Sequence, residues 1–275
     1  MKRHALLTAA LLVTAAGSLL AHDMFLKLET FFLAENATVA IQLVNGTFDK
    51  SENSITRDRM ADVSVVMGDG YVSKPSESAW HDHPRSSWLE FETGAAGTYV
   101  VGVSTNPTVF ELSGEDFDGY LEHDGVVDII EKRKAEGTFG QSAVERYSKH
   151  VKAIVQVGEA RTDAYEQALG HPVEFIPLQN PYEVGVGDTF QVLFLKFGEP
   201  VANQMIYASH EAYHGHTEEG GHLEAVSTRT NGEGVASFRL SAEGKWYIRT
   251  INMIEPDDGE ADYESNWATL TFEVQ

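Results

Sequence analysis

The sequence predicts a mainly β protein with two β-sandwich domains, immunoglobulin-like or transthyretin-like, and a helical insert between them. Short apolar runs recur between turns rich in Gly, Asn and Asp, which is typical of sandwiches rather than of βαβ units. After Pro107 the apolar spacing becomes helical, and strand-like runs return beyond residue 172. The expected divisions are a leader at 1–21, a first β-sandwich domain at 22–110, the helical insert and linker at 111–170 and a second β-sandwich domain at 171–275.

The leader has the pattern of a cleaved secretory signal peptide. A short basic start precedes the apolar run Ala5–Val13, and small residues lead up to an expected cut after Ala21. A membrane anchor is the weaker interpretation, because polar and glycine residues interrupt the run and it is shorter than a span of about 20 residues. Cuts after Ala16 or Ser18 stay open. We therefore expect a periplasmic protein without a membrane span, beginning at His22.

The first domain is predicted from strand-like runs at similar spacing. Ala34, Glu35 and Asn36 form a turn between the first two runs, and Gly68 to Gly70 close the third. Their lengths are those usual for strands. The runs are Phe25–Leu33, Ala37–Val44, Asp62–Met67, Ser87–Glu92 and Gly97–Val103.

The insert is predicted to contain helices. Ser113 can cap a helix that starts at Gly114, with Phe117, Tyr120 and Leu121 on one face, and the helical spacing continues through residues 126–130. A further helix is expected over about 142–155. Its buried side would carry Val144, Tyr147, Val151, Ile154 and Val155.

The second domain is predicted to be a Greek-key sandwich of about seven strands. Asn231-Gly232 and Glu243-Gly244 are suited to hairpin turns. The strand-like runs lie at 173–178, 188–195, 204–209, 223–228, 235–240, 245–251 and 268–274.

Charge and cysteine content limit the possible partners. The chain has 42 Asp+Glu against 20 Lys+Arg, a net charge of -22, so nucleic acid and anionic membrane surfaces are expected to repel it, whereas cations are natural partners. It has no Cys, which excludes disulfides, iron–sulfur clusters and thiolate zinc sites. Any metal must be held by His, carboxylate, Met or backbone atoms.

The histidines are the candidate metal ligands. At a mature N-terminus, His22 would offer its α-amine and its ring Nδ1, which together close a chelate ring on Ni(II), Cu(II), Co(II) or Zn(II). A glycine-containing loop between two expected strands gathers four more imidazoles, those of His210, His214, His216 and His222. His81 and His83 form a smaller pair, two residues apart and so able to face the same side of a strand. A solvated loop that collects metals weakly is the alternative for both groups.

Catalytic motifs do not decide the function. The chain has no G-x-S-x-G elbow, no H-E-x-x-H and no phosphate-binding glycine loop, so we expect a protein that is not an enzyme. Two alternatives stay open. One is a non-metal envelope module that binds a protein or glycan, and the other is a copper redox enzyme with an N-terminal histidine brace.

The order of several short segments resembles the DUF4198 family. Each segment alone is weakly specific, but together they cover nearly the whole mature chain. They are Ala21-His22-Asp23, Phe117–Leu121, Glu145–Ala153, Pro172–Tyr182, Gly187-Asp188, Thr230–Gly234 and Trp267–Glu273.

The resemblance implies an exported bacterial protein, because members are often described as periplasmic components similar to nickel or cobalt transport proteins. It implies two β-sandwich-like domains and an N-terminal His that helps to hold a transition metal. The expected partners are then a metal ion, nickel or cobalt before copper or zinc, and a membrane metal-uptake transporter. One departure is Asn252, where related tails tend to carry His, and this puts any site that uses that residue in doubt.

Overall fold

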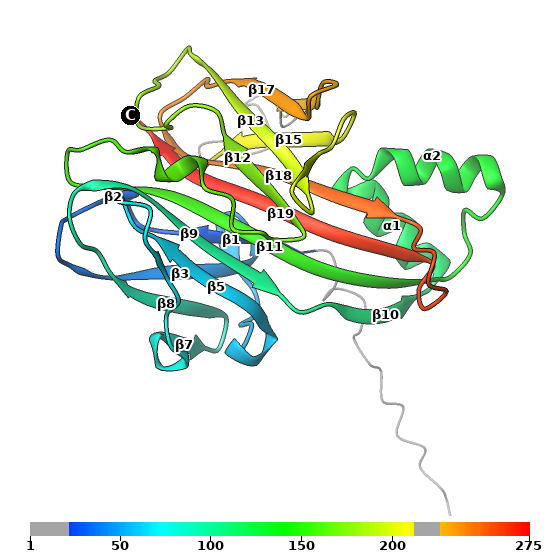
Figure 1. Ribbon diagram of the computed structural model, residues 1–275. Helices are drawn as coiled ribbons and strands as arrows, with labels where there is room; N and C mark the ends of the chain where they lie inside the picture. The colour runs from blue at the N-terminus through cyan, green and yellow to red at the C-terminus, as the bar shows by residue number, and fades with distance from the viewer. Residues whose placement is uncertain (1–21, 212–225) are drawn as a thin grey trace, which may run out of the picture.

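The computed structural model describes residues 22–211 and 226–275, and these fold into three β-sheets and two α-helices (Figure 1). The predicted mainly β class is confirmed. Short 3-10 helices, η1 (Arg57–Arg59), η2 (Glu77–Ala79) and η3 (Asp163–Glu166), connect some of the strands. No helix in the described part of the chain is long and apolar enough to cross a membrane.

A ten-stranded sheet runs through the whole molecule. Its centre is the parallel pair β11 and β19, in register from Glu145 opposite Tyr263 to Ala153 opposite Thr271. Two short strands, β10 (Thr108–Leu112) and β2 (Phe32–Leu33), pair with β11 beside the main path. The main path is β16 (Val226–Arg229), β15 (Met205–His210), β18 (Gly244–Ile254), β19 (Tyr263–Val274), β11 (Ala143–Val157), β9 (Gly97–Thr105), β5 (Met60–Val66) and β6 (Val72–Ser73).

Two smaller sheets complete the β structure. The five-stranded sheet comes from the N-terminal part of the chain and the four-stranded sheet from the C-terminal part. The first contains β1 (Asp23–Lys27), β3 (Thr38–Thr47), β8 (Ser86–Glu92) and β7 (Trp80–His83), with β4 (Lys50–Ser51) paired to β3. The second contains β12 (Val173–Pro177), β13 (Thr189–Lys196) and β14 (Glu199–Pro200), with β17 (Val235–Arg239) paired to β13.

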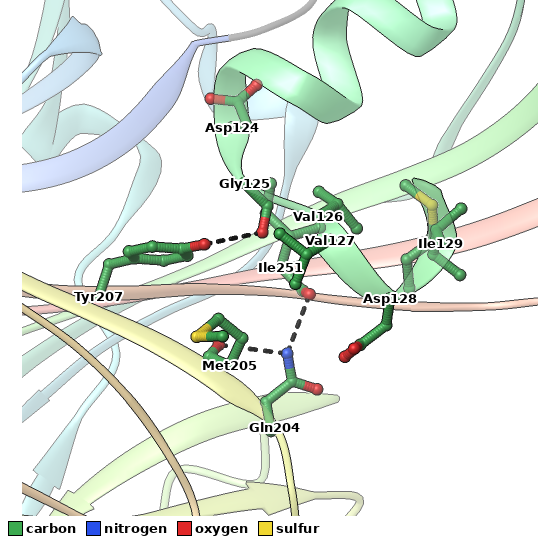
Figure 2. Close-up of a pocket in the computed structure, with 11 residues that line it drawn as sticks. Asp124, Gly125, Val126, Val127, Asp128, Ile129, Gln204, Met205, Tyr207 and Ile251 are labelled. Carbon is green, nitrogen blue, oxygen red and sulfur yellow. Dashed lines mark hydrogen bonds between the residues drawn. The ribbon is translucent and has the colours of Figure 1, made fainter. Parts of the chain in front are cut away.

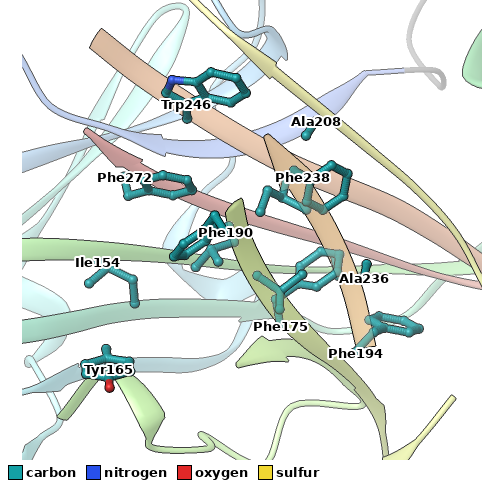
Figure 3. Close-up of a cluster of buried hydrophobic side chains, with 14 of the residues drawn as sticks. Ile154, Tyr165, Phe175, Phe190, Phe194, Ala208, Ala236, Phe238, Trp246 and Phe272 are labelled. Atoms are coloured by element: carbon teal, nitrogen blue, oxygen red, sulfur yellow. The ribbon is translucent and has the colours of Figure 1, made fainter. Parts of the chain in front are cut away.

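The two smaller sheets cover opposite faces of the large one. Along β11, Ala153 and Val155 enter the core beneath the five-stranded sheet, whereas Ile154 enters the core beneath the four-stranded sheet. Figure 3 shows this second core, where Phe190 and Phe272 lie together with ring centroids 4.7 Å apart. Both layers therefore share the same central strands.

A buried ion pair links β11 to β12 within the second layer. Lys152 Nζ lies 3.0 Å from Glu174 Oε2 and donates to the carbonyl of Phe175 at 3.0 Å. Burial lowers the pKa of Lys152, and the Lys152 ammonium helps to keep the pKa of Glu174 below its usual value although burial alone would raise it. Each group therefore depends on its partner for remaining charged inside the protein.

The first predicted helix is confirmed. Helix α1 (Gly114–Asp124) starts after Ser113, whose hydroxyl accepts the Asp116 N–H, and ends at Gly125 in the left-handed conformation. Helix α2 (Val127–Glu136) follows at once and ends at Gly137. The apolar face of α1 packs against the ends of β18 and β19.

The helix predicted over about 142–155 is wrong, because these residues form β11, the longest strand of the protein. Its run contains Val144, Val151, Ile154 and Val155, and β-branched residues favour strands. Since β11 is buried on both faces, apolar residues occur on both sides and the alternation typical of a strand is lost. The helical spacing in this run was coincidental.

Candidate functional site

His22 lies directly before β1, where it meets a carboxylate. Its Nε2 is 3.0 Å from Oε2 of Glu52, and its side chain is only 17% exposed. The β3–β4 hairpin positions Glu52, whose N–H donates to the carbonyl of Asn45 at 2.9 Å. Nδ1 of His22 is buried and has no hydrogen-bond partner in the described part of the chain. A proton held on Nε2 by Glu52 leaves the lone pair of Nδ1 available to a ligand.

Lys149 fixes the main chain of His22. Its ammonium, on β11, donates to the His22 carbonyl and to Oδ1 of Asn45 at 3.1 Å. Burial lowers the pKa of Lys149 to about 8, while the nearby carboxylates of Asp23 and Asp124 act in the opposite direction. The position of His22 is therefore set by the largest sheet rather than by its own strand alone.

A group of buried charges continues from Asp23. Nε of Arg249 is 3.4 Å from Oδ2 of Asp23, and Nη1 of Arg249 donates to the carbonyl of Asp124 at 3.3 Å. Burial raises the pKa of Asp23, an effect that Arg249 opposes. At the end of α1, a hydrogen bond to Asp124 raises the pKa of His123. These contacts tie β1, β18 and α1 together at one end of the molecule.

Glu145 is a further buried acid in this group. Its Oε1 accepts the hydroxyls of Tyr120, at 3.2 Å, and Ser265, whereas its Oε2 has no hydrogen-bond partner among the described residues. Burial raises the pKa of Glu145 to about 7, and the charge of Asp124 adds to the effect. Lys149 acts against this increase. Glu145 therefore titrates near neutral pH.

The predicted loop cluster is only partly described. His210 is the last residue of β15, opposite Trp246, with ring centroids 4.8 Å apart, and burial lowers its pKa. His214, His216 and His222 lie outside the described residues. Trp246, opposite His210, is three residues from Arg249 on β18, and Arg249 is the partner of Asp23. At about 3.3 Å per residue, roughly 10 Å of strand separates Trp246 from Arg249.

His81 and His83 lie on β7 with exposed side chains. This strand is the edge of the five-stranded sheet opposite to β1, so about 14 Å, three steps of about 4.8 Å, separates the two strands. The structure therefore does not bring this pair to His22. In residues 22–211 and 226–275 no three His, Asp or Glu side chains are grouped so that they could hold a metal ion.

Sequence reasoning did not find the buried acids around His22. Asp124 and Glu145 are 21 residues apart in the chain, and Glu145 was assigned to a helix that does not form. Lys149, also in that segment, was not singled out. The useful signal would have been ionisable residues inside a run that is otherwise strongly apolar, since a buried strand must pair them.

A small cavity lies where α1 and α2 meet β15 and β18 (Figure 2). Its volume of about 50 Å³ holds only water-sized molecules. Tyr207 donates to the carbonyl of Gly125 at 2.9 Å, and Nε2 of Gln204 donates to the carbonyl of Ile251 at 3.1 Å. Tyr207 and Gln204 thus donate to main-chain carbonyls, whereas Oδ2 of Asp124, which also lines the cavity, is buried and has no hydrogen-bond partner among the described residues.

The sequence profile of the domain of unknown function DUF4198 matches residues 19–253, which include His22 and all of the buried charges around it. The chain belongs to the DUF4198 family. In this DUF4198 chain, Asn252 lies buried on β18, and its Nδ2 donates to Oε1 of Gln204 at 2.8 Å. That position therefore serves a hydrogen bond between β18 and the residue that precedes β15. No curated protein is similar enough to the chain to count as a match.

Several solved structures are distantly similar to this DUF4198 protein. The trypsin-activated alpha-2-macroglobulin of Escherichia coli is 10% identical with a TM-score of 0.25, and the aligned region covers 92% of this chain and 15% of the macroglobulin. The D0-D1 domain of intimin is 12% identical with a TM-score of 0.21, covering 91% of this chain and 97% of that one. The Yersinia pseudotuberculosis adhesin InvE is 10% identical with a TM-score of 0.24, covering 92% and 58%. Likeness at this level carries no functional argument, and the chain spans only a small part of the macroglobulin.

Proposed function

We propose that this DUF4198 protein is an exported, periplasmic protein that binds a divalent transition metal as its cargo. Nickel or cobalt is the first choice and copper or zinc the next, and the protein would serve metal uptake or buffering. It would act by binding and transfer to a membrane uptake system, without catalysis. The candidate ligands are His22, as the primary one, and His210, His214, His216 and His222, whereas His81 and His83 lie on the opposite edge of their sheet from β1 and are left out of the site.

The environment of His22 is the observation that carries the proposal. In metal sites, the ligating imidazole commonly donates its second ring N–H to a carboxylate, which fixes the tautomer and strengthens the metal bond. Glu52 stands 3.0 Å from Nε2 in that role, and Nδ1 is buried without a partner in the described residues. Cleavage after Ala21 would place an α-amine on the same residue. Nδ1 and that amine are the two donors of a chelate ring.

The surroundings of His22 also favour a cation. Its main chain is fixed through the contact between its carbonyl and Lys149, so little ordering is needed when the metal binds. The net charge of -22 raises the concentration of cations near the protein surface. His22 and its amine supply two donors, and further ligands would come from the loop that follows His210.

Metal titration of the processed protein tests the proposal. A protein that begins at His22 should bind one equivalent of Ni(II) or Co(II). A variant with one additional alanine before His22 keeps the imidazole but displaces the amine, and it should bind the metal roughly 100-fold more weakly, since one ring of the chelate is lost. The variant Glu52→Gln should lose about 10- to 100-fold in affinity, the usual effect of removing an orienting carboxylate.

The variant His81→Gln is the matched control, because His81 is exposed on β7 and far from β1. It should bind metal as the unmodified protein does. Equal affinity and stoichiometry with and without the additional alanine would show that the N-terminal site is wrong. Loss of binding only when His210, His214, His216 and His222 are replaced together would move the site to the loop.

A further inference from the structure

A second cavity, distinct from the one in Figure 2, opens beside the main chain of His22. It lies between the β3–β4 hairpin, the segment leading into η1, and strands β9 and β11, and its volume is about 240 Å³. We call it the basic cavity. The lining residues that matter here are Asn45, Asn53, Arg59, Thr105, Tyr147 and Lys149.

The charge of the basic cavity is opposite to that of the molecule. Asp and Glu outnumber Lys and Arg 42 to 20 in the chain, yet the charged side chains that line this cavity are both cations, Arg59 and Lys149. The remaining polar lining consists of amides and hydroxyls, which can donate hydrogen bonds. The cavity is thus a local positive site in a strongly negative protein.

Both cations have donors left over. Nε of Arg59 is buried and has no hydrogen-bond partner in the described part of the chain. The Lys149 ammonium has three N–H groups and donates to two neutral oxygens, the His22 carbonyl and Oδ1 of Asn45. Within the described residues, neither cation lies within ion-pair distance of a carboxylate. Asp23, Asp124 and Glu145 act on Lys149 from beyond ion-pair distance, so a bound anion would give the remaining donors a direct partner and relieve the cost of leaving them unpaired.

The backbone holds these donors in place before any ligand arrives. The N–H of Arg59 donates to the carbonyl of Thr56 at 3.0 Å, and the carbonyl of Arg59 accepts from Asn106 at 2.8 Å. On the other wall, the N–H of Lys149 donates to Oγ1 of Thr105 at 2.9 Å. The main chain that carries both cations is therefore fixed, which reduces the ordering that a ligand must bring about.

The lining also includes apolar surface. Tyr147, on β11, is held by an edge contact with Phe110, with ring centroids 5.1 Å apart, and Ile55 lines the cavity from the segment that leads into η1. An inorganic oxyanion would leave this surface without a partner, whereas the carbon skeleton of an organic acid would cover it. The volume of about 240 Å³ limits the ligand to a small molecule.

We propose that the basic cavity binds a small organic acid, whose carboxylate accepts hydrogen bonds from Arg59 and Lys149 while its carbon skeleton packs against Tyr147 and Ile55. A guanidinium presents its donors in a planar fork that matches a carboxylate. This site is separate from the proposed metal centre, because it uses side chains of η1 and β11 rather than the imidazole of His22. It goes beyond the proposed function and does not depend on metal.

Calorimetric titration of metal-free protein tests the proposal. The chain would be freed of metal on a chelating resin and titrated with benzoate, succinate or inorganic phosphate at pH 7. We expect saturable, one-to-one binding of at least one of the two carboxylates. Arg59→Gln should weaken that binding about tenfold or more, as removal of one partner of a desolvated charge pair does. Arg57→Gln is the matched control, because it removes the same charge from η1 at a residue outside the lining, and it should leave the affinity within about twofold.

Asn53→Asp gives an independent test that keeps Arg59 in place. It changes a lining amide into a carboxylate of the same shape, and it should also weaken carboxylate binding by about tenfold through repulsion of the ligand. The proposal would be overturned if neither carboxylate bound, if Arg57→Gln and Arg59→Gln had equal effects, or if only phosphate bound in an Arg59-dependent way. Since no metal is present, a failure here would leave the result at His22 unaffected.

Discussion

Glu145 makes the stability of this protein depend on pH in a defined direction. It is 1% exposed, and burial raises its pKa from 4.5 to about 7. Between these two values the folded protein holds a proton that the unfolded chain has released. The free energy of unfolding contributed by this group must therefore fall as pH rises from about 4.5 to 7.

The magnitude follows from the shift in pKa. At about 1.4 kcal/mol per pKa unit, the complete loss is roughly 3 kcal/mol, and about 2 to 3 kcal/mol of it falls between pH 5 and pH 8. Asp124 adds to the penalty on the charged form, while Lys149 and the hydroxyls of Tyr120 and Ser265 reduce it. These groups are all buried, so solvent screens the effect only weakly.

The variant Glu145→Gln isolates this contribution, because glutamine has nearly the shape of the protonated acid and does not titrate. Urea unfolding at pH 5 and pH 8 should show that the variant gains about 2 to 3 kcal/mol relative to the unmodified protein between the two pH values. Glu131→Gln, at an exposed position on α2, is the control and should show no such gain. The reasoning is refuted if Glu145→Gln and the unmodified protein have the same pH dependence within about 0.5 kcal/mol.

Two further replacements test how the layers and the helix are held. Glu174→Gln leaves Lys152 buried without its carboxylate partner, and urea unfolding should show a loss of about 3 to 5 kcal/mol; a loss under about 1 kcal/mol would contradict a charged pair. Ser113→Ala removes the cap of α1 and should cost about 1 kcal/mol in the same assay. Ser76→Ala is its control, since Ser76 precedes η2 but caps no N–H, and an equal loss there would argue against capping.

Local signals in the sequence predicted the parts of the fold that local chemistry determines. Ser113 marks the start of α1 because capping depends on a few neighbouring residues, whereas the end of the helix at Gly125 was not predicted. The strand β11 was not predicted, because its apolar residues face two different cores and the sequence therefore lacks the alternation of a strand. The partition of the chain into successive sandwiches also missed the sheet that joins them, which depends on pairing between distant strands.

The sequence likewise identified one residue of the candidate site but not the residues that contact it. His22 could be singled out from its place after the leader pattern, without knowledge of the fold. Glu52, by contrast, is brought to it by a hairpin, and Lys149 reaches it from a strand 127 residues away in the chain. Contacts of this kind depend on the register of the sheets, which residue spacing does not contain.

The parallel pairing of β11 and β19 determines when the fold can form during synthesis. Residues 118 apart in the chain are paired there, and β19 follows all the other described strands in the chain. Until β19 emerges, β18 and β11 cannot join the same sheet. The five-stranded and four-stranded sheets then lack the complete large sheet on which both pack. Folding of the large sheet must therefore wait for β19, and we expect it to be slow, as pairing between distant segments requires.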